Sequence, residues 1–200
     1  MTTAQDLALV ALGVTPGRTV EQGDLSLALA AAEVIDLVGA GALTLDEDRM
    51  VPGAPVRTGD RLLDEAATAL VREEPFETVE DWLWRRGRGL AAAYVDELEA
   101  DGPGARGRGR RNPLLGRRPE VDPAARDRAE RRRASGEPVL SVLAAAAGAQ
   151  DEKPEAEQGI ADDAVTTVLA AVGNAVMELE AVRQRREIED AAFDNVWRGF

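Results

Sequence analysis

Residues 58–83, TGDRLLDEAATALVREEPFETVEDWL, predict two short helices separated at Pro75. The first helix is expected over residues 60–73, where apolar side chains recur every three or four positions. The second begins at Thr78, which forms a capping box with Asp81. Its two tryptophans, Trp82 and Trp84, point to different faces of the helix, so the first is predicted to be core and the second a half-exposed cover. The apolar positions of the first helix are Leu62, Leu63, Ala66, Ala67, Leu70 and Val71.

Before this stretch, the pattern predicts two helices and a hairpin. The helices are expected over residues 4–12, capped by Thr2 or Thr3, and over residues 24–38, capped by Asp24. Residues 43–51 alternate between apolar and polar side chains around an acidic turn, which is typical of a small β-hairpin.

After this stretch, helices are predicted over residues 90–100, 124–134 and 139–147, and a long apolar helix follows. The sequence therefore predicts a mainly α fold: a single globular helical bundle of residues 1–200 with a buried C-terminal helix, amphipathic surrounding helices and the hairpin. A flexible basic segment is expected at 102–123 and an acidic linker at 150–160. The apolar positions of the C-terminal helix are Val165, Val168, Leu169, Val172, Val176 and Leu179.

The residue order of the opening stretch resembles the signature of the Golgi phosphoprotein 3 family. That signature has a Gly-Asp before a Leu-Leu-Asp-Glu-Ala helix, then a Pro, then Glu-Thr-Val ahead of a Trp. The matching residues here are Gly59-Asp60, 62–66, Pro75, 77–79 and Trp82. The resemblance extends over roughly residues 4–100 and 161–182, and it implies a mostly helical single domain.

The resemblance also implies a function. Eukaryotic members of that family are peripheral membrane adaptors, which hold the phosphate of phosphatidylinositol 4-phosphate with a Trp and several Arg side chains. In this chain the corresponding positions are Glu21, Ala30, Arg88 and Ala91. Only Arg88 has the required type, and a carboxylate at the Trp position repels phosphate. The implied function is a non-enzymatic peripheral membrane adaptor whose phosphoinositide binding is lost or altered.

The amino-acid composition excludes several kinds of catalytic and metal site. The chain has no Cys, which excludes thiolate nucleophiles and cysteine zinc sites, and no His, which removes the commonest general base and the commonest metal ligand. We therefore expect no enzyme activity and no cofactor. No uninterrupted apolar run reaches the roughly 18 residues of a membrane span, and the N-terminus lacks the positive region of a secretory signal. A cytoplasmic protein is expected, either free or peripheral at the inner face of the cell membrane.

Charge points to one candidate surface. The net charge is −13, yet residues 106–133 hold eleven arginines against four acids. Such a segment suits anionic phospholipid headgroups, or pairs as a solvated loop with the acidic body. The arginines that we assign to this polybasic surface are Arg106, Arg108, Arg110, Arg111, Arg117 and Arg118.

Two smaller features are also candidates. Trp84, Arg85, Arg86 and Arg88 together could hold a lipid phosphate, with the indole at headgroup level. The spacing of Phe193, Trp197 and Phe200 makes an apolar stripe that can dock on the chain's own core or on a protein partner.

Two alternative functions remain open from the sequence. One is a soluble protein-interaction scaffold without lipid binding. The other is a winged-helix DNA-binding regulator, because helix, helix and hairpin follow one another over residues 4–51. Residues 24–38 contain no Arg or Lys, so binding to nucleic acid is disfavoured.

Overall fold

The central element of the fold is α2, Gln22–Gly39, in the computed structural model, which describes residues 2–14, 19–102, 121–150 and 160–198. Residues 28–34 of α2 have no exposed surface at all. A helix that is buried on every side forms the middle of a core, and its alanines let neighbours approach closely. Those neighbours are α1 (Thr3–Gly13), α3 (Arg61–Ala69), α4 (Val79–Arg86), α5 (Leu90–Ala100), α7 (Pro138–Ala146) and α8 (Asp163–Arg198).

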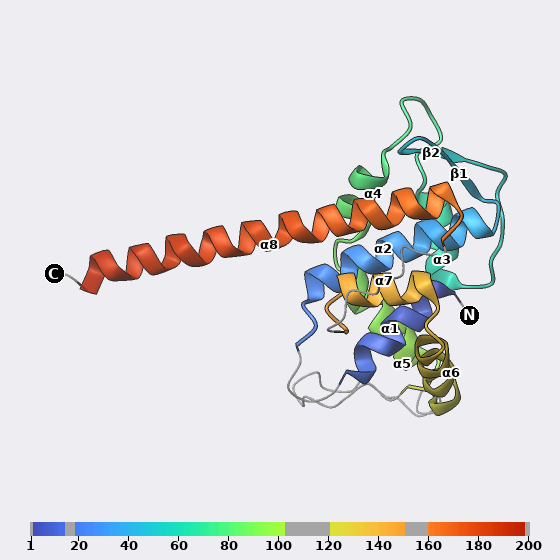
Figure 1. Ribbon diagram of the computed structural model, residues 1–200. Coiled ribbons are helices and arrows are strands. Elements are labelled where there is room, and N and C mark those ends of the chain that lie inside the picture. The colour runs from blue at the N-terminus through green and yellow to red at the C-terminus, as the bar shows by residue number, and fades with distance from the viewer. Residues whose placement is uncertain (1, 15–18, 103–120, 151–159, 199–200) are drawn as a thin grey trace.

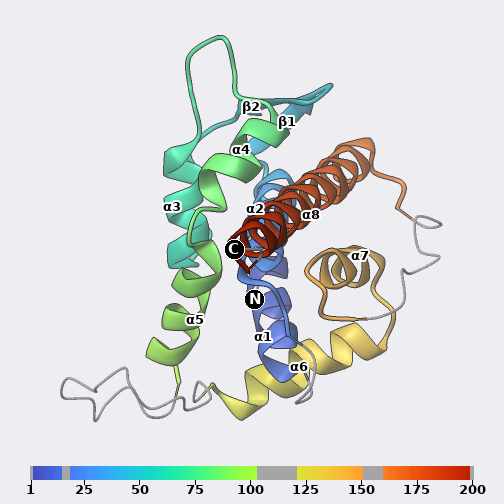
Figure 2. The ribbon, with the colours of Figure 1, turned by 90° about the vertical axis from the view of Figure 1, so that its left-hand side faces the viewer.

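The other helices are arranged around α2 as a bundle. Seen along α8, the helices α3, α4 and α5 lie on one side of α2 and α7 lies on the other (Figure 2). The remaining helix, α6 (Pro123–Ala134), packs against α1 through Ala125 and Ala129. This arrangement confirms the predicted mainly α bundle.

The two helices of residues 58–83 form as predicted. Asp60 caps α3 by accepting a hydrogen bond from the Leu63 N–H, and the Thr78 hydroxyl caps α4 by accepting one from the Asp81 N–H. One difference is that α3 ends at Ala69, so Val71, which was predicted to be inside, is 39% exposed.

The two tryptophans divide as predicted. Trp82 has no exposed surface, and its Nε1 donates to the carbonyl oxygen of Ala30 at 3.2 Å. Trp84 is partly buried and packs against the outside of the core. Trp82 therefore ties α4 directly to the middle of α2.

The predicted hairpin is also present. Strand β1, Leu43–Asp46, pairs antiparallel with β2, Arg49–Pro52. The backbone at the hairpin turn also bonds to the start of α4, since Val79 N–H donates to the Asp48 carbonyl and Met50 N–H to the Glu77 carbonyl, both at 2.9 Å. These backbone hydrogen bonds attach the hairpin to the start of α4.

The position of α2 changes two expectations. Asp24 lies in the first turn of α2 and is not its cap, which is Glu21. The winged-helix alternative is wrong, because the helix that would have to enter a DNA groove is the most buried helix in the described part of the chain.

The C-terminal helix is longer and less buried than predicted. Val168, Leu169, Val172 and Ala175 of α8 are buried against the bundle, whereas the second half of α8 extends beyond it (Figure 1). By length and mean hydropathy, Asp163–Asp190 meets the criteria for a membrane span, contrary to the sequence-based expectation. A mostly buried core helix meets the same criteria, but only 22% of this window is buried, although α8 packs against α2, α4 and α7.

Some predictions fall outside the described residues. The polybasic arginines from Arg106 to Arg118 and most of the acidic linker at 150–160 belong to this group. So does the stripe of Phe193, Trp197 and Phe200, since side chains are described only as far as residue 190.

Candidate functional site

A surface hollow lies where the start of α2 meets the start of α5. Its volume is about 320 Å³, and its lining is mostly apolar. The hollow includes Ala91 and the two neighbours of Glu21, so the fold brings together two of the positions that the family resemblance assigns to lipid phosphate. The lining residues are Val20, Gln22, Leu25, Ala91, Ala92, Val95 and Asp96.

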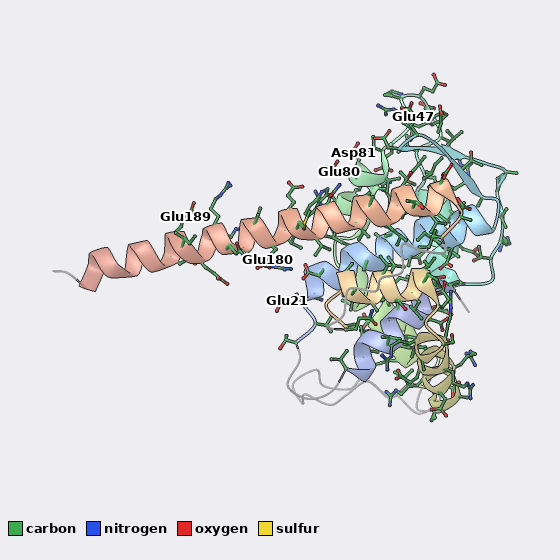
Figure 3. The ribbon with its side chains drawn as sticks, viewed as in Figure 1. Glu21, Glu47, Glu80, Asp81, Glu180 and Glu189 are labelled. Atoms are coloured by element: carbon green, nitrogen blue, oxygen red, sulfur yellow. The ribbon has the colours of Figure 1, made fainter. Side chains whose placement is uncertain are left out.

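The charge around this hollow is negative. Asp96 is in its lining, and Glu21, the residue just before the start of α2, is exposed (Figure 3). No arginine or lysine is among the described residues that line it. Ser26 fixes the junction, because its hydroxyl accepts a hydrogen bond from the Ala91 N–H at 3.1 Å. The hollow is therefore an apolar and acidic surface, which suits neither phosphate nor sulfate.

Arg85 is exposed, but its guanidinium is paired with neighbouring groups of the protein. Its Nε and Nη2 donate to the two carboxylate oxygens of Glu77 at 2.6 and 2.7 Å, and Nη2 also donates to the Ala69 carbonyl. The guanidinium lies 5.1 Å from the centroid of the Trp82 ring. The hydrogen bonds to Glu77 raise the pKa of Arg85. These contacts join α4 to the end of α3 and occupy most of the donors of Arg85.

Arg86 belongs to a buried ionic cluster. Its Nε and Nη2 each donate to one oxygen of Glu33 at 2.8 Å, and the Tyr94 hydroxyl donates to the same carboxylate at 3.1 Å. Nη2 also bonds to the Leu62 carbonyl. Burial raises the pKa of Glu33 and of Tyr94. The cluster connects α2, α3, α4 and α5, and its role is to fix the bundle.

The four residues of the second candidate site are thus not assembled on one surface. Arg85 and Arg86 are paired internally, and Trp84 is partly buried. Arg88 is exposed and forms no ion pair with any residue of the described ranges. Of this group, Arg88 is the residue whose guanidinium is open to a ligand.

The end of the polybasic region is visible in α6. Arg126 and Arg131 are exposed there, whereas Arg132 pairs with Asp6 and Glu137 and Arg133 pairs with Glu130. Part of the basic charge is therefore used to attach α6 to α1 and α7, and part faces solvent.

The cluster of Glu33, Arg86 and Tyr94 was not predicted from the sequence. The available signal was a single carboxylate inside the run ALAAAEV, since burial of an acid in such a run requires a partner.

Comparison with protein families gives a match over almost the whole chain. The model of the family described as Golgi phosphoprotein 3 (GPP34) matches residues 4–196. The chain belongs to the Golgi phosphoprotein 3 family. No curated protein and no solved structure matches it.

Membership of the Golgi phosphoprotein 3 family agrees with the placement of residues 58–83. In this family member the signature forms the α3–α4 unit, which supplies Trp82 and Arg86 to the centre of the bundle. The signature is accordingly a feature of the scaffold. The surface that contacts a ligand has to be sought elsewhere.

Proposed function

We propose that this Golgi phosphoprotein 3 family member is a non-enzymatic adaptor at membrane surfaces, where it contacts anionic phospholipid by charge and without selecting phosphatidylinositol 4-phosphate. The observation that carries the proposal is the hollow between α2 and α5. It stands at the positions implied for lipid phosphate, but its lining is apolar with one carboxylate.

Selective recognition of a phosphate monoester needs donors that converge on it. Arginine is the usual choice, because its guanidinium pairs with two phosphate oxygens at once. Among the described residues the lining of the hollow offers no such group, and Glu21 and Asp96 repel a dianion. We therefore expect a lipid with a phosphorylated headgroup to bind at this hollow no more tightly than any other anionic lipid.

Non-selective attraction requires only basic side chains near the surface. Each contributes about 1 kcal/mol against an anionic membrane. The segment of Arg106 to Arg118 supplies this charge in the sequence, and Arg126 and Arg131 of α6 are exposed next to it in the chain. The acidic remainder of the chain opposes contact, so the basic segment has to face the membrane. Such a protein would be cytoplasmic and peripheral at the inner face of the cell membrane.

A charge-matched pair of variants tests the contact surface. The first changes Arg108, Arg110, Arg117 and Arg118 to Ser. The second changes four exposed arginines elsewhere, Arg49, Arg57, Arg72 and Arg186, to Ser, and so removes the same charge. The proposal expects the first to lose flotation on phosphatidylserine vesicles and the second to keep most of it. Equal loss in both would show that only net charge matters, and the segment would not be the contact surface.

A second candidate function is a protein-interaction scaffold without lipid binding. It is favoured by the acidic edge of the hollow and by the half of α8 that extends beyond the bundle. Absence of flotation on every anionic vesicle would support it over the membrane proposal.

A further inference from the structure

The second half of α8 is a helix without a partner in the described part of the chain. Near the edge of the bundle, Arg183 pairs with Asp24 of α2 at 2.8 and 3.0 Å. Every side chain from Gln184 to Asp190 is then exposed, and the helix continues to Arg198 (Figure 1). A helix of this length without tertiary packing is only marginally stable in water. A second surface that covered this half would stabilise it.

Exposed apolar side chains collect on this helix. Among the described residues, the large hydrophobic side chains that are exposed are Val71, Met177, Val182 and Ile188. Three of the four belong to α8, and Met177 and Ile188 are 64% and 70% exposed. Isolated exposed apolar residues are common, so what matters is whether those of α8 lie on one face of the helix.

Met177 and Ile188 belong to one stripe along α8, which we call the α8 stripe. Its members are Ala170, Asn174, Met177, Ala181, Gln184 and Ile188, and all are exposed. Their alternating spacing of four and three residues is the repeat by which two helices pack in a coiled coil. The stripe lies away from the buried face formed by Val168, Val172 and Ala175. Two bundles can therefore remain on the outside while their stripes meet.

We propose that the α8 stripe binds the α8 stripe of a second copy of the chain in a parallel, in-register coiled coil. The charges beside the stripe complement one another in this arrangement. In a parallel coiled coil, a residue beside the seam of one helix faces the residue five positions further along the other helix. Glu180 of one copy therefore faces Arg185 of the other. Because the two copies are equivalent, this contact is made twice. An asparagine in a coiled-coil seam, such as Asn174, favours this parallel two-stranded register.

The other arrangements fit the charges less well. In an antiparallel pair that keeps the whole stripe in contact, the midpoint falls near residue 179, where Glu178 and Glu180 of both copies would oppose one another. An anionic membrane surface is disfavoured because acids outnumber arginines between residues 178 and 190, and Glu180 and Glu189 lie along the helix in Figure 3.

The mass of the chain in solution tests the pairing. Sedimentation equilibrium of the full chain over a range of concentrations is expected to show a concentration-dependent rise from 21.3 kDa to twice that mass. Changing Met177 and Ile188 to Glu is expected to leave a monomer. Val182→Glu places the same charge outside the stripe and should keep the dimer. A chain that stays monomeric throughout, or a dimer that survives M177E/I188E, would overturn the proposal.

Cysteine cross-linking tests the direction of the pairing. The chain contains no cysteine, so a single introduced thiol reports one position. Ile188→Cys is expected to cross-link two copies on mild oxidation, because in-register parallel helices bring position 188 next to itself. Arg186→Cys lies on the opposite side of the helix and should cross-link far less. Equal yields from both variants, or no cross-link from Ile188→Cys, would contradict the parallel arrangement.

A charge exchange gives a third readout. Glu180→Arg and Arg185→Glu are each expected to weaken the dimer by bringing like charges together, and the double variant to restore it. If the double variant does not dimerise as well as the unchanged chain, Glu180 and Arg185 do not face one another in the interface, which would contradict the parallel, in-register arrangement.

Discussion

Asp24 and Arg183, which lie 159 residues apart in the sequence, form a two-bond ion pair that attaches α8 to the first turn of α2. Both side chains are largely shielded, with 15% and 26% of their surfaces exposed. The hydrogen bonds to Asp24 raise the pKa of Arg183. Gly23 makes the close approach possible, because a Cβ there would lie 2.8 Å from Leu179 Cδ2. The pair fixes the point where α8 leaves the bundle.

Removal of this pair should loosen α8 locally. For Arg183→Ala we expect a stability loss of about 1 kcal/mol, since a partly shielded pair contributes at the upper end of the surface range. Hydrogen exchange should accelerate in residues 176–190 and remain slow in α2. Arg186→Ala, a change of an exposed arginine on the same helix, is the control. Equal acceleration in both variants would mean that Asp24 does not hold the helix.

The buried ionic cluster predicts a large effect from one arginine and almost none from another. Arg86→Ala leaves Glu33 without a cation in a site with no exposed surface, and we expect a loss of about 3–5 kcal/mol in the free energy of unfolding. Arg88→Ala, two residues further along and exposed, should change it by less than about 0.5 kcal/mol. Denaturant unfolding of the two variants measures both values. Similar losses would contradict the assignment of Arg86 to the core.

The two tryptophans allow a similar comparison. Trp82→Ala removes a wholly buried ring and the donor to the Ala30 carbonyl, and should cost about 3–5 kcal/mol. Trp84→Ala removes a partly buried ring at the edge of the core and should cost clearly less. Thermal unfolding monitored by circular dichroism ranks the two. A larger loss of stability in Trp84→Ala would mean that Trp84, and not Trp82, lies on the face of α4 that packs against the core.

Asp64 predicts part of the response to acid. The N–H of Thr58, followed by its hydroxyl, lowers the pKa of Asp64 by hydrogen bonding to the carboxylate. Because the pKa is lower in the folded state, this stabilisation is present above the ordinary value near 4 and is lost as the pH falls through the folded-state pKa. Asp64→Asn should therefore be less stable at neutral pH and lose less on acidification. Thr58→Val, which keeps the N–H, should show a smaller change. An unchanged acid slope in D64N would contradict this account.

Local patterns predicted most of the fold, because caps and helical spacing are local. Thr2 and Thr78 cap their helices as expected, and Trp82 points inward as its spacing predicts. Glu33 shows the limit of such patterns. Whether a carboxylate on a helix is exposed or buried depends on whether an arginine 53 residues away reaches it, which no local pattern contains.

The extent of α8 illustrates the same limit. Its apolar residues predicted a core helix, and Val168 and Val172 are indeed buried. The bundle, however, covers only one face of the first half, so Met177 and Ile188 are exposed. Burial along a helix depends on the length of its neighbours, which spacing within the helix does not show. The candidate lipid site could not be judged from the sequence either, because the partners of Arg85 and Arg86 lie in other elements: Glu77 pairs with Arg85, which is exposed, and Glu33 pairs with Arg86, which is largely buried.

The most direct test of the proposed function is flotation of the chain with vesicles at about 0.15 M salt, where exposed charges further apart than about 8 Å are screened. Three vesicles are compared: neutral, with phosphatidylserine, and with phosphatidylinositol 4-phosphate, the last two matched in total lipid charge. We predict equal flotation on the two anionic vesicles and none on the neutral one. Selective flotation on phosphatidylinositol 4-phosphate would contradict the account and would point to a phosphate site built around Arg88.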